Sequence, residues 1–372
     1  MGSAARNRAG TRDTLGDLDD TIQPRQGEEI DPNRLALWLA AQGESGEVRI
    51  EQFPNGHSNL VYLVHVGDHE YVLRRPPLGP VAPKAHDMVR EFRVLDAVHP
   101  HFPEAPKVLF LCQDPQVLGA PFFLMERRHG VVLRGVAPPE WSALPDYPRL
   151  ASEAVVDCLA RLHAIDISGE DISTEKLRAL GKPEGFVERQ VRGWAERWRA
   201  AKTDELPEMD RVIAWLHDRL PPQLVPSLVH NDFKLDNVML GPGADHVQAV
   251  LDWEMATLGD PLADLGLTLC YWTWAAVAAE HDPHPATPVI TTQPGWYTRD
   301  QFAERYARQT GRDLTHLGYH EVLGVFKLAV ILQQIYFRYH RGQTSDVRFR
   351  EFDKRVRGLV LLAARMVDGS HI

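Results

Sequence analysis

Strand-like and helix-like patterns separate along this 372-residue chain, and that separation constrains its fold more than any other feature. Between residues 48 and 75, apolar and polar residues alternate in short runs divided by turn-forming residues, which predicts an antiparallel meander. A helix at about 85–98 and strands at 107–111 and 122–126 follow. The rest of the chain has helical spacing, apart from a β-hairpin at 237–251. The sequence therefore predicts an α+β protein with a small antiparallel sheet lobe and a larger, mainly helical lobe.

The domain boundaries follow from the same change of pattern. Residues 1–28 are polar and lack periodicity, so we expect a flexible tail there. Residues 29–126 are expected to form the N-terminal lobe and residues 127–372 the C-terminal lobe, with one short crossing that predicts a cleft. Helices of the C-terminal lobe are expected at 150–162, 184–201, 206–219, 260–280, 298–310, 317–340 and 347–367.

Composition excludes several classes of protein. The 41 Lys and Arg against 51 Asp and Glu give a net charge of −10, which argues against nucleic-acid binding because that needs a basic surface. Cys112, Cys158 and Cys270 lie far apart without a CxxC pair, so a reducing cytoplasm is the expected setting. The N-terminus has no apolar core, and the longest mostly apolar stretch, 265–279, is shorter than the roughly 20 residues that span a membrane. We therefore expect a soluble protein that binds no membrane.

One polar segment carries most of the functional information. It is Val229–Asn237, VHNDFKLDN, and Asp252 follows Asn237 by fifteen residues at the end of an apolar strand. Buried charges cost several kcal/mol unless they are paired or bind a metal. A loop this polar that runs into a β-hairpin indicates catalysis more than stability.

At this point a resemblance to a known family is plain. HNDFKLDN resembles the catalytic loop of protein-kinase-like phosphotransferases, and VLDWE resembles their metal-binding Asp. The segments GHSNLVYLV, YVLRRPP, HNDFKLDNVML and VLDWEMATLGDPLADLG are similar to the aminoglycoside phosphotransferase and choline-kinase branch. Within that branch they look like the kinase-like domains related to those fused to acyl-CoA dehydrogenases. The resemblance covers about residues 30–350 and implies a two-lobe, protein-kinase-like fold that uses ATP and Mg²⁺.

The resemblance also implies roles for single residues. Asp232 accepts or orients the proton of the acceptor hydroxyl, and Lys234 touches the transferred phosphoryl group. Asn237 and Asp252 hold the Mg²⁺ that bridges the ATP phosphates. These residue types suit the chemistry, since phosphoryl transfer needs positioning, a metal and neutralisation of charge, and Mg²⁺ prefers oxygen ligands. His230 is expected to brace the loop by hydrogen bonds.

The predicted small lobe provides a second set of residues. Glu91 lies on the apolar stripe of the 85–98 helix and needs a cation, and the strand YVLRR offers Arg74 or Arg75 on opposite faces. The resemblance implies a strand lysine paired with a helix glutamate; here Arg74 stands at that position. An arginine can bridge carboxylate and phosphate, but its reach differs, so the choice between Arg74 and Arg75 stays open.

Two further segments are expected to contact the nucleotide, and one more carboxylate is expected to hold the catalytic loop in place. Glu126 and Arg127 end the last strand of the small lobe and should form the hinge that reads the adenine edge. Asp264, in GDPLADLG, is expected to brace the catalytic loop. The loop between the first two strands resembles the nucleotide-covering loop, whose residues here are Gly56, His57, Ser58 and Asn59.

The leading hypothesis is a cytoplasmic small-molecule kinase that phosphorylates a hydroxyl group. A hydroxyacyl-CoA or related hydroxy acid is the candidate acceptor, with an acyl-CoA dehydrogenase as candidate pathway partner; no acidic loop for a cationic aminoglycoside is identified. The oligomeric state stays open. The alternatives are a nucleotide-binding pseudokinase or partner-binding module, and an enzyme that transfers AMP. A P-loop is excluded because GxxxxGK[ST] does not occur, and the histidines of HDPHP lack zinc-helix spacing.

Overall fold

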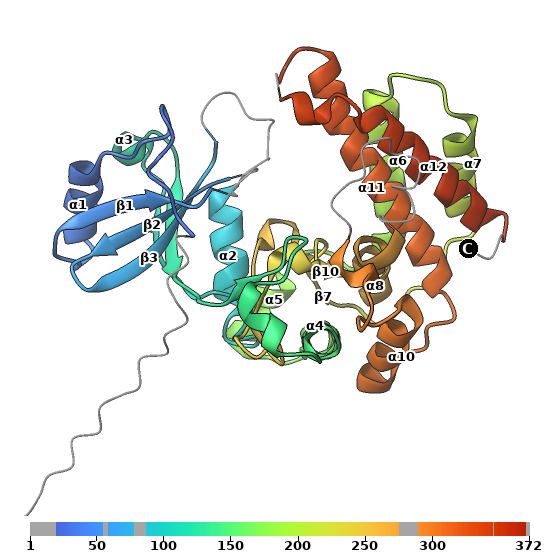
Figure 1. Ribbon diagram of the computed structural model, residues 1–372, viewed down its shortest axis with the longest axis horizontal. Coiled ribbons are helices and arrows are strands. Elements are labelled where there is room, and N and C mark those ends of the chain that lie inside the picture. The colour runs from blue at the N-terminus through green and yellow to red at the C-terminus, as the bar shows by residue number, and fades with distance from the viewer. Residues whose placement is uncertain (1–19, 55–58, 78–86, 275–288, 345, 370–372) are drawn as a thin grey trace, which may run out of the picture. The chain divides into compact units, whose positions relative to one another are not determined.

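The computed structural model describes residues 20–54, 59–77, 87–274, 289–344 and 346–369, and the chain divides into two compact units (Figure 1). The first unit comprises residues 1–89 and 109–127, and the second comprises residues 90–108 and 128–372. An antiparallel sheet dominates the first unit and helices dominate the second, so the predicted α+β class is confirmed.

In its described residues, the first unit is a five-stranded sheet with two helices. The strands run in the order β1-β2-β3-β5-β4, and the first three form the antiparallel meander that the sequence predicted. Asp31 caps α1 by accepting hydrogen bonds from two backbone N–H groups, as its position before Pro32 suggests. The elements are α1 (Pro32–Ala40), β1 (Val48–Gln52), β2 (Leu60–Val66), β3 (His69–Arg75), β4 (Val108–Cys112), α3 (Pro115–Leu118) and β5 (Phe122–Glu126).

The ordered part of this unit begins earlier than the sequence indicates. Ile22 exchanges two backbone hydrogen bonds with Gln52 in β1, each with an N···O distance of 2.8 Å. The backbone N–H of Arg25 also donates to the Gln52 side chain. The predicted end of the flexible tail, at residue 28, therefore lies too far along the chain. The bridge between Ile22 and Gln52 is a single residue pair, so it leaves no alternating pattern in the sequence.

Helix α2 (Met88–Val98) and the loop after it belong mainly to the second unit. Phe102 packs edge-on against Trp253, with ring centroids 5.9 Å apart, and the carbonyl of Glu104 accepts a hydrogen bond from the Val250 N–H. The predicted boundary at residue 126 assigned this whole stretch to the N-terminal lobe. Contacts with residues more than a hundred positions further along the chain instead place this stretch mainly in the second unit.

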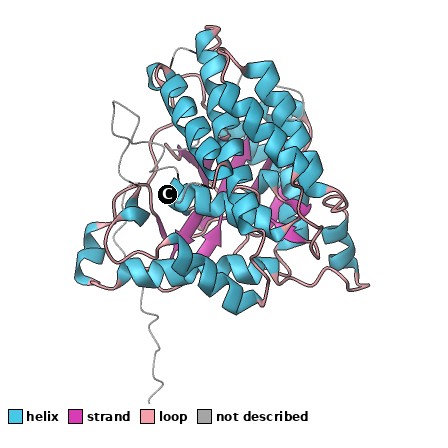
Figure 2. Cartoon of the chain, turned by 90° about the vertical axis from the view of Figure 1, so that its right-hand side faces the viewer, coloured by secondary structure: helices cyan, strands magenta, loops and turns pink. Residues whose placement is uncertain are grey.

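The second unit is mainly helical, and Figure 2 draws the helices in cyan. Helix α11 (Leu317–His340) packs against α6, α7, α8 and α12 and contributes to an extensive apolar core. By length and hydropathy α11 could also cross a membrane, but 56% of its most apolar window is buried inside the protein, as in the core helix of a soluble domain. Besides α2, the α-helices of this unit that the structure describes are α4 (Tyr147–His163), α5 (Ile172–Arg178), α6 (Phe186–Ala201), α7 (Pro207–Asp218), α8 (Pro261–Leu269), α10 (Arg299–Thr310), α11 (Leu317–His340) and α12 (Phe352–Val367).

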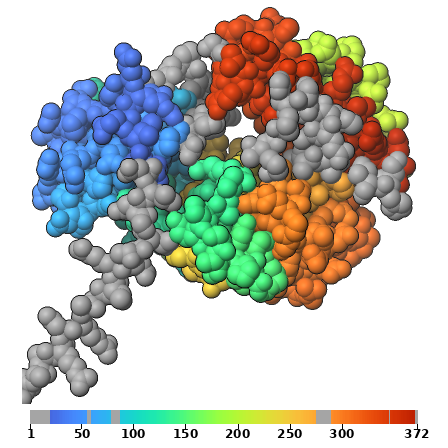
Figure 3. All heavy atoms as spheres, in the orientation of Figure 1, coloured from blue at the N-terminus to red at the C-terminus, as the bar shows by residue number. Residues whose placement is uncertain are grey.

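Helices far apart in sequence are joined by polar contacts. The surface of α10 (orange) adjoins that of α4 (green) in Figure 3. There Arg305 forms an ion pair with Asp157, in which Nε lies 2.8 Å from Oδ1. Helices α4 and α10 therefore stabilise each other by a direct contact that does not involve α11.

Two small sheets hold the functional loops. β7 (Ser227–Val229) pairs with β10 (Thr257–Gly259). β6 (Val131–Val132), β8 (Val238–Leu240) and β9 (Val247–Val250) form the other sheet, which contains the predicted hairpin.

The predicted helix over 260–280 is not one continuous α-helix. Helix α8 ends at Leu269 and a π-helical turn, Cys270–Trp274, follows; residues 275–280 lie outside the described residues. In that turn the carbonyl of Trp272 accepts a hydrogen bond from the Thr291 hydroxyl. Such turns occur mostly inside helices near functional sites, and apolar periodicity does not reveal them. The last predicted helix similarly starts at Phe352, after a 3₁₀ turn at Val347–Phe349.

Candidate active site

The motif loop lies between two short, buried strands, β7 and β8. Because β7 pairs with β10 and β8 with β9, antiparallel ladders hold both ends of residues 230–237. Asn231 (φ 64°) and Asp252 (φ 67°) adopt the left-handed backbone conformation. For a residue other than glycine this costs on the order of 1–3 kcal/mol, and such residues cluster at functional sites. Both segments that carry the motif thus contain such a residue; among the described residues Ala244, in the turn between β8 and β9, is the other one that is not glycine.

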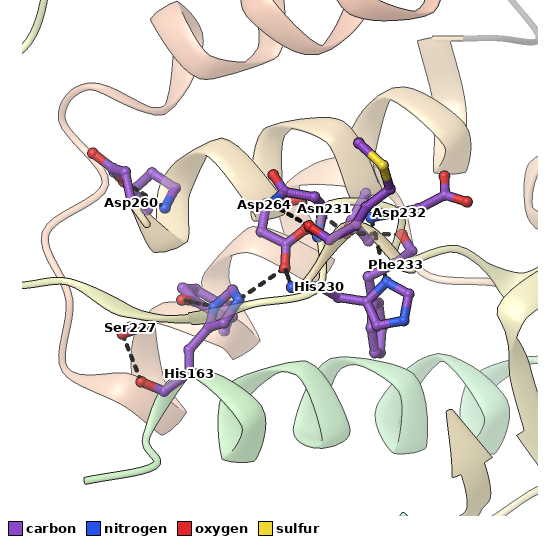
Figure 4. Close-up of polar contacts among 12 residues, drawn as sticks. His163, Ser227, His230, Asn231, Asp232, Phe233, Asp260 and Asp264 are labelled. Atoms are coloured by element: carbon purple, nitrogen blue, oxygen red, sulfur yellow. Dashed lines mark hydrogen bonds and ion pairs between the residues drawn. The ribbon is translucent and has the colours of Figure 1, made fainter. Parts of the chain in front are cut away.

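Asp264, in the first turn of α8, fastens this loop to the helical core (Figure 4). Its Oδ2 accepts the backbone N–H of His230 at 2.6 Å, and its Oδ1 accepts that of Asn231 at 2.8 Å. The Nε2 of His163 lies 3.3 Å from Oδ2. Burial alone would raise the pKa of Asp264, but the hydrogen bonds and charges of His163 and His230 lower it overall. Asp264 is therefore an ionised brace for the loop.

His230 holds the loop from inside. Its Nε2 donates to the carbonyl of Leu251 at 3.0 Å, and its Nδ1 accepts the backbone N–H of Asp232 at 3.3 Å. Its ring packs edge-on against Trp253, with centroids 4.8 Å apart. Burial lowers the pKa of His230 against the opposing charges of nearby aspartates, so the imidazole is neutral, with its proton on Nε2. These contacts give His230 the bracing role that the sequence analysis expected.

The Asp232 carboxylate is held by two neighbours in the same loop. The Nζ of Lys234 lies 2.8 Å from Asp232 Oδ2 and 3.0 Å from Oδ1. The Nδ2 of Asn237 donates to the same Oδ2 at 2.9 Å and to the Asp232 carbonyl at 2.8 Å. Charge-assisted hydrogen bonds of this kind fix orientation as well as contributing energy. The structure thus brings Asp232, Lys234 and Asn237 together around one carboxylate.

Asp252 follows the strand that pairs with the end of this loop. The Leu251 N–H donates to the carbonyl of Asn237 at 2.8 Å, so Asp252 is the next residue beyond that contact. Asn237 uses its amide nitrogen on Asp232, which keeps its amide oxygen for another partner. Mg²⁺ is commonly bound by one or two protein oxygens together with substrate phosphates, and Asn237 with Asp252 fit such a site. Within the described ranges no cluster of three His, Cys, Asp or Glu could hold a metal ion without such phosphate ligands.

A cavity of about 250 Å³ adjoins the loop. The Nζ of Lys234 at its edge lies 4.9 Å from the centroid of the Tyr271 ring. Burial, and then the charge of Asp232, raises the pKa of Tyr271 well above its usual range, so this phenol stays protonated. Trp272, from the same π-helical turn, adds a second aromatic ring to the cavity lining. The cavity is lined by Leu133, Arg134, Gly135, Lys234, Leu235, Asp236, Thr268, Tyr271, Trp272, Val289, Ile290 and Thr291.

The two candidate arginines of β3 are both buried, and the strand pairing places them on opposite faces. Arg75 lies on the same face of the sheet as Tyr62, and that face packs against α1 in the apolar core of the first unit. Arg74 lies on the other face, opposite Phe123 of β5. This arrangement favours Arg74 as the nucleotide-binding cation. Glu91 is 1% exposed on α2, and its ion pair with Arg74 stays a prediction.

The other predicted nucleotide contacts lie at the ends of strands in the first unit. Asn59 is buried just before β2. Glu126 ends β5, and the guanidinium of Arg127 forms an ion pair with Glu70 at 3.0 Å, which leaves its backbone as the group to contact a base. The hinge role stays a prediction. Three members of the predicted nucleotide-covering loop lie outside the described residues: Gly56, His57 and Ser58.

His163 is a site residue that the sequence analysis missed. It ends α4, is 1% exposed, and joins Asp264 to the hydroxyl of Tyr306, which lies 2.7 Å from its Nδ1. A histidine in the last turn of a helix is common, because it suits the helix dipole. Its partner Asp264 lies 101 positions further along the chain, so no local pattern could have linked the two.

The fold and this loop together define a class, the protein-kinase-like phosphotransferases that act on small molecules. The model of the phosphotransferase enzyme family matches residues 49–317. The chain belongs to this family.

Similar proteins agree with that assignment. The chain is 32% identical to mouse acyl-CoA dehydrogenase family member 10 over 330 residues, which are 87% of the chain and 30% of that protein. It is also 32% identical to chicken acyl-CoA dehydrogenase family member 11, across 91% of the chain and 44% of that protein. The chain thus spans less than half the length of these relatives. A putative aminoglycoside phosphotransferase from Ralstonia eutropha JMP134 has a similar structure, with a TM-score of 0.75, 27% identity and coverage of 92% of this chain and all of that one.

Proposed function

We propose that this chain transfers the γ-phosphoryl group of ATP, with Mg²⁺, to a hydroxyl group of a small molecule. The observation that carries the proposal is the Asp232 carboxylate, held by Lys234 and Asn237 beside a cavity of about 250 Å³. In the reaction a bond forms between the acceptor oxygen and the γ-phosphorus. The bond from that phosphorus to the β–γ bridging oxygen breaks, and the hydroxyl proton is released.

Each residue of the loop has a separate task in this proposal. Asp232 orients the acceptor hydroxyl and takes up its proton. Lys234 places a positive charge beside the transferred group, where negative charge spreads over the phosphoryl oxygens. Asn237 and Asp252 would bind Mg²⁺, which when present neutralises charge on the phosphates. Asp264 keeps the backbone in the conformation that holds these side chains together.

The acceptor that we propose is a hydroxyacyl-CoA or a related hydroxy acid. The names of the two relatives support it, since a kinase and an acyl-CoA dehydrogenase on one chain would act on related acyl compounds. An acyl-CoA dehydrogenase is then the proposed pathway partner. The cysteines are free and buried, which supports the cytoplasmic location that we propose.

One observation favours a second candidate, a nucleotide-binding protein without turnover. β3 carries Arg74 and Arg75 at the place where the family resemblance implies a lysine. An arginine binds phosphate through two parallel hydrogen bonds and positions it differently from a lysine. If that difference prevents in-line attack, ATP binds and no phosphoryl group moves.

The test is a screen of hydroxylated metabolites with Mg·ATP, in which the mass of each product is measured. We expect a product heavier by one phosphoryl group; a gain of AMP would instead show nucleotidyl transfer. Asp232→Asn should lose at least a hundredfold in turnover and still bind Mg·ATP. The matched control is Asp245→Asn, because Asp245 lies in the exposed turn between β8 and β9. ATP binding without any product from the wild type would favour the second candidate.

A further inference from the structure

Lys327, on helix α11, is a buried cation that the proposed mechanism does not use. The residue is 4% exposed, in a position surrounded by the apolar core of the second unit. Among the described residues, no oxygen accepts a hydrogen bond from its ammonium group and no carboxylate lies within ion-pair distance of it. A buried charge without such a partner costs several kcal/mol, so the position requires an explanation.

An aromatic ring supplies only part of what this charge needs. The Nζ of Lys327 lies 5.7 Å from the centroid of the Trp194 ring on α6. A cation–π contact is worth about 2 kcal/mol when desolvated, which is less than the cost of burying the charge. The Trp194 N–H is engaged by Gln190, and an indole offers no lone pair to an ammonium group. The ring therefore leaves the ammonium without an acceptor.

A second cation shares the same ring. The guanidinium carbon of Arg197 lies 4.6 Å from the Trp194 centroid, and this side chain is exposed. Burial lowers the pKa of Lys327, and the charge of Arg197 adds to that effect while Asp264 and Asp232 oppose it. Two cations gathered on one tryptophan without a carboxylate between them repel each other. An anion placed between them would remove both the repulsion and the burial cost.

The site is linked to the cavity beside the catalytic loop. The π-helical turn that supplies Tyr271 and Trp272 to the cavity also supplies Cys270 to the core that contains Trp194. Tyr271 itself packs against that core, and α11 packs against both α8 and the turn (Figure 1). The charge of Asp232 is one of those that act on Lys327, and it raises the pKa of that side chain.

We propose that Lys327, with Arg197 and Trp194, binds an anionic group of the acceptor, a carboxylate or a phosphate, while the hydroxyl group of the same molecule lies beside Asp232. This inference rests on the proposed function and specifies the class of its substrate. The anion accepts charge-assisted hydrogen bonds from the buried ammonium, and the exposed arginine attracts it on approach. A polycationic acceptor would be repelled by the same pair of charges.

The test measures binding and transfer separately on two matched pairs of compounds. One pair is 3-hydroxybutyrate and its methyl ester, and the other is glycerol 3-phosphate and glycerol. We expect the wild type to bind the anionic member of at least one pair more tightly, and the pair concerned distinguishes carboxylate from phosphate. Lys327→Met should weaken binding of that anion by about ten- to a hundredfold and leave the neutral member unchanged. The effect should appear in KM rather than in kcat.

Two further variants keep the result decisive if Lys327→Met folds poorly. Lys327→Arg retains the charge and should retain the preference for the anion. Arg197→Gln removes only an exposed group and should lower that preference severalfold. Equal binding of the charged and neutral members by the wild type would overturn the inference, and so would an unchanged preference in both Lys327→Met and Arg197→Gln. A preserved preference for the anion without any phosphorylated product would refute the phosphotransfer and leave this binding site intact.

Discussion

Replacing Asp264 by asparagine tests how the catalytic loop is held. The carboxylate accepts two backbone N–H groups, at 2.6 Å from His230 and 2.8 Å from Asn231, and is 1% exposed. Hydrogen bonds to a charged group contribute about 1.5–3 kcal/mol each, and an orphaned buried N–H costs about 1–3 kcal/mol. Asparagine retains one acceptor oxygen and directs an N–H₂ group at the other donor. We therefore expect the loop to lose about 3–5 kcal/mol of local stability.

Amide hydrogen exchange of the peptide that spans residues 227–240 measures this loss directly. A change of 3–5 kcal/mol corresponds to a fall in protection of about a hundredfold to about five-thousandfold. Asp300→Asn serves as the control, because Asp300 is exposed in the first turn of α10 and should change protection of the loop very little. Protection of residues 227–240 in Asp264→Asn within threefold of the wild type would refute the bracing role.

The same carboxylate predicts how stability depends on pH. The pKa of Asp264 is lowered in the folded protein, so its contribution is fully present above the ordinary pKa of an aspartate, about 3.9. It is lost only as the pH falls below that value, towards the lower pKa of the folded state. The difference in protection between the wild type and Asp264→Asn should be constant from pH 6 to 8 and should shrink in acid. A difference that shrinks near neutral pH would point to a histidine instead.

Two other predictions concern the metal and the helical core. Asn237→Ala should reduce phosphoryl transfer at least a hundredfold and raise the Mg²⁺ concentration needed for half-maximal rate, since it removes a proposed ligand and a hydrogen bond to Asp232; an unchanged Mg²⁺ requirement would exclude Asn237 as a ligand. Gly266→Ala should destabilise the protein by at least about 1–3 kcal/mol in thermal unfolding, because its Cβ would lie 2.5 Å from the carbonyl carbon of His320. Gly193→Ala, on α6, is the matched control and should stabilise by about 0.5–1 kcal/mol, because the Cβ would meet only the flexible end of the Arg197 side chain, at an ordinary contact distance of 3.5 Å. Equal effects of the two glycine substitutions would contradict the close packing of α8 on α11.

The sequence predicted well those elements whose pattern is local. The meander β1–β3 and helices such as α6, α10 and α11 follow from alternation or from apolar spacing, and their bounds lie within two residues of the prediction. The catalytic loop was found because its polar residues are contiguous in the chain. The π-helical turn Cys270–Trp274 and the short strands β7 and β10 were not predicted, because packing against distant segments decides them.

The site residues divide in the same way. Asp232, Lys234 and Asn237 are brought together by their own loop, so a motif of nine residues was enough to group them. His163 ends a separate helix and looks locally like an ordinary helical residue. Its role depends on burial and on its contact with Asp264 from another element, and only the folded chain provides these.

The most direct test of the phosphotransfer site is a crystal structure of this chain with Mg²⁺ and a non-hydrolysable ATP analogue. We expect one Mg²⁺ bound by the Oδ1 of Asn237 and a carboxylate oxygen of Asp252, at about 2.1 Å from each, and by phosphate oxygens. The γ-phosphate should face Asp232 and Lys234. A nucleotide whose phosphates lie away from Asp252, or a metal that contacts neither residue, would contradict the account.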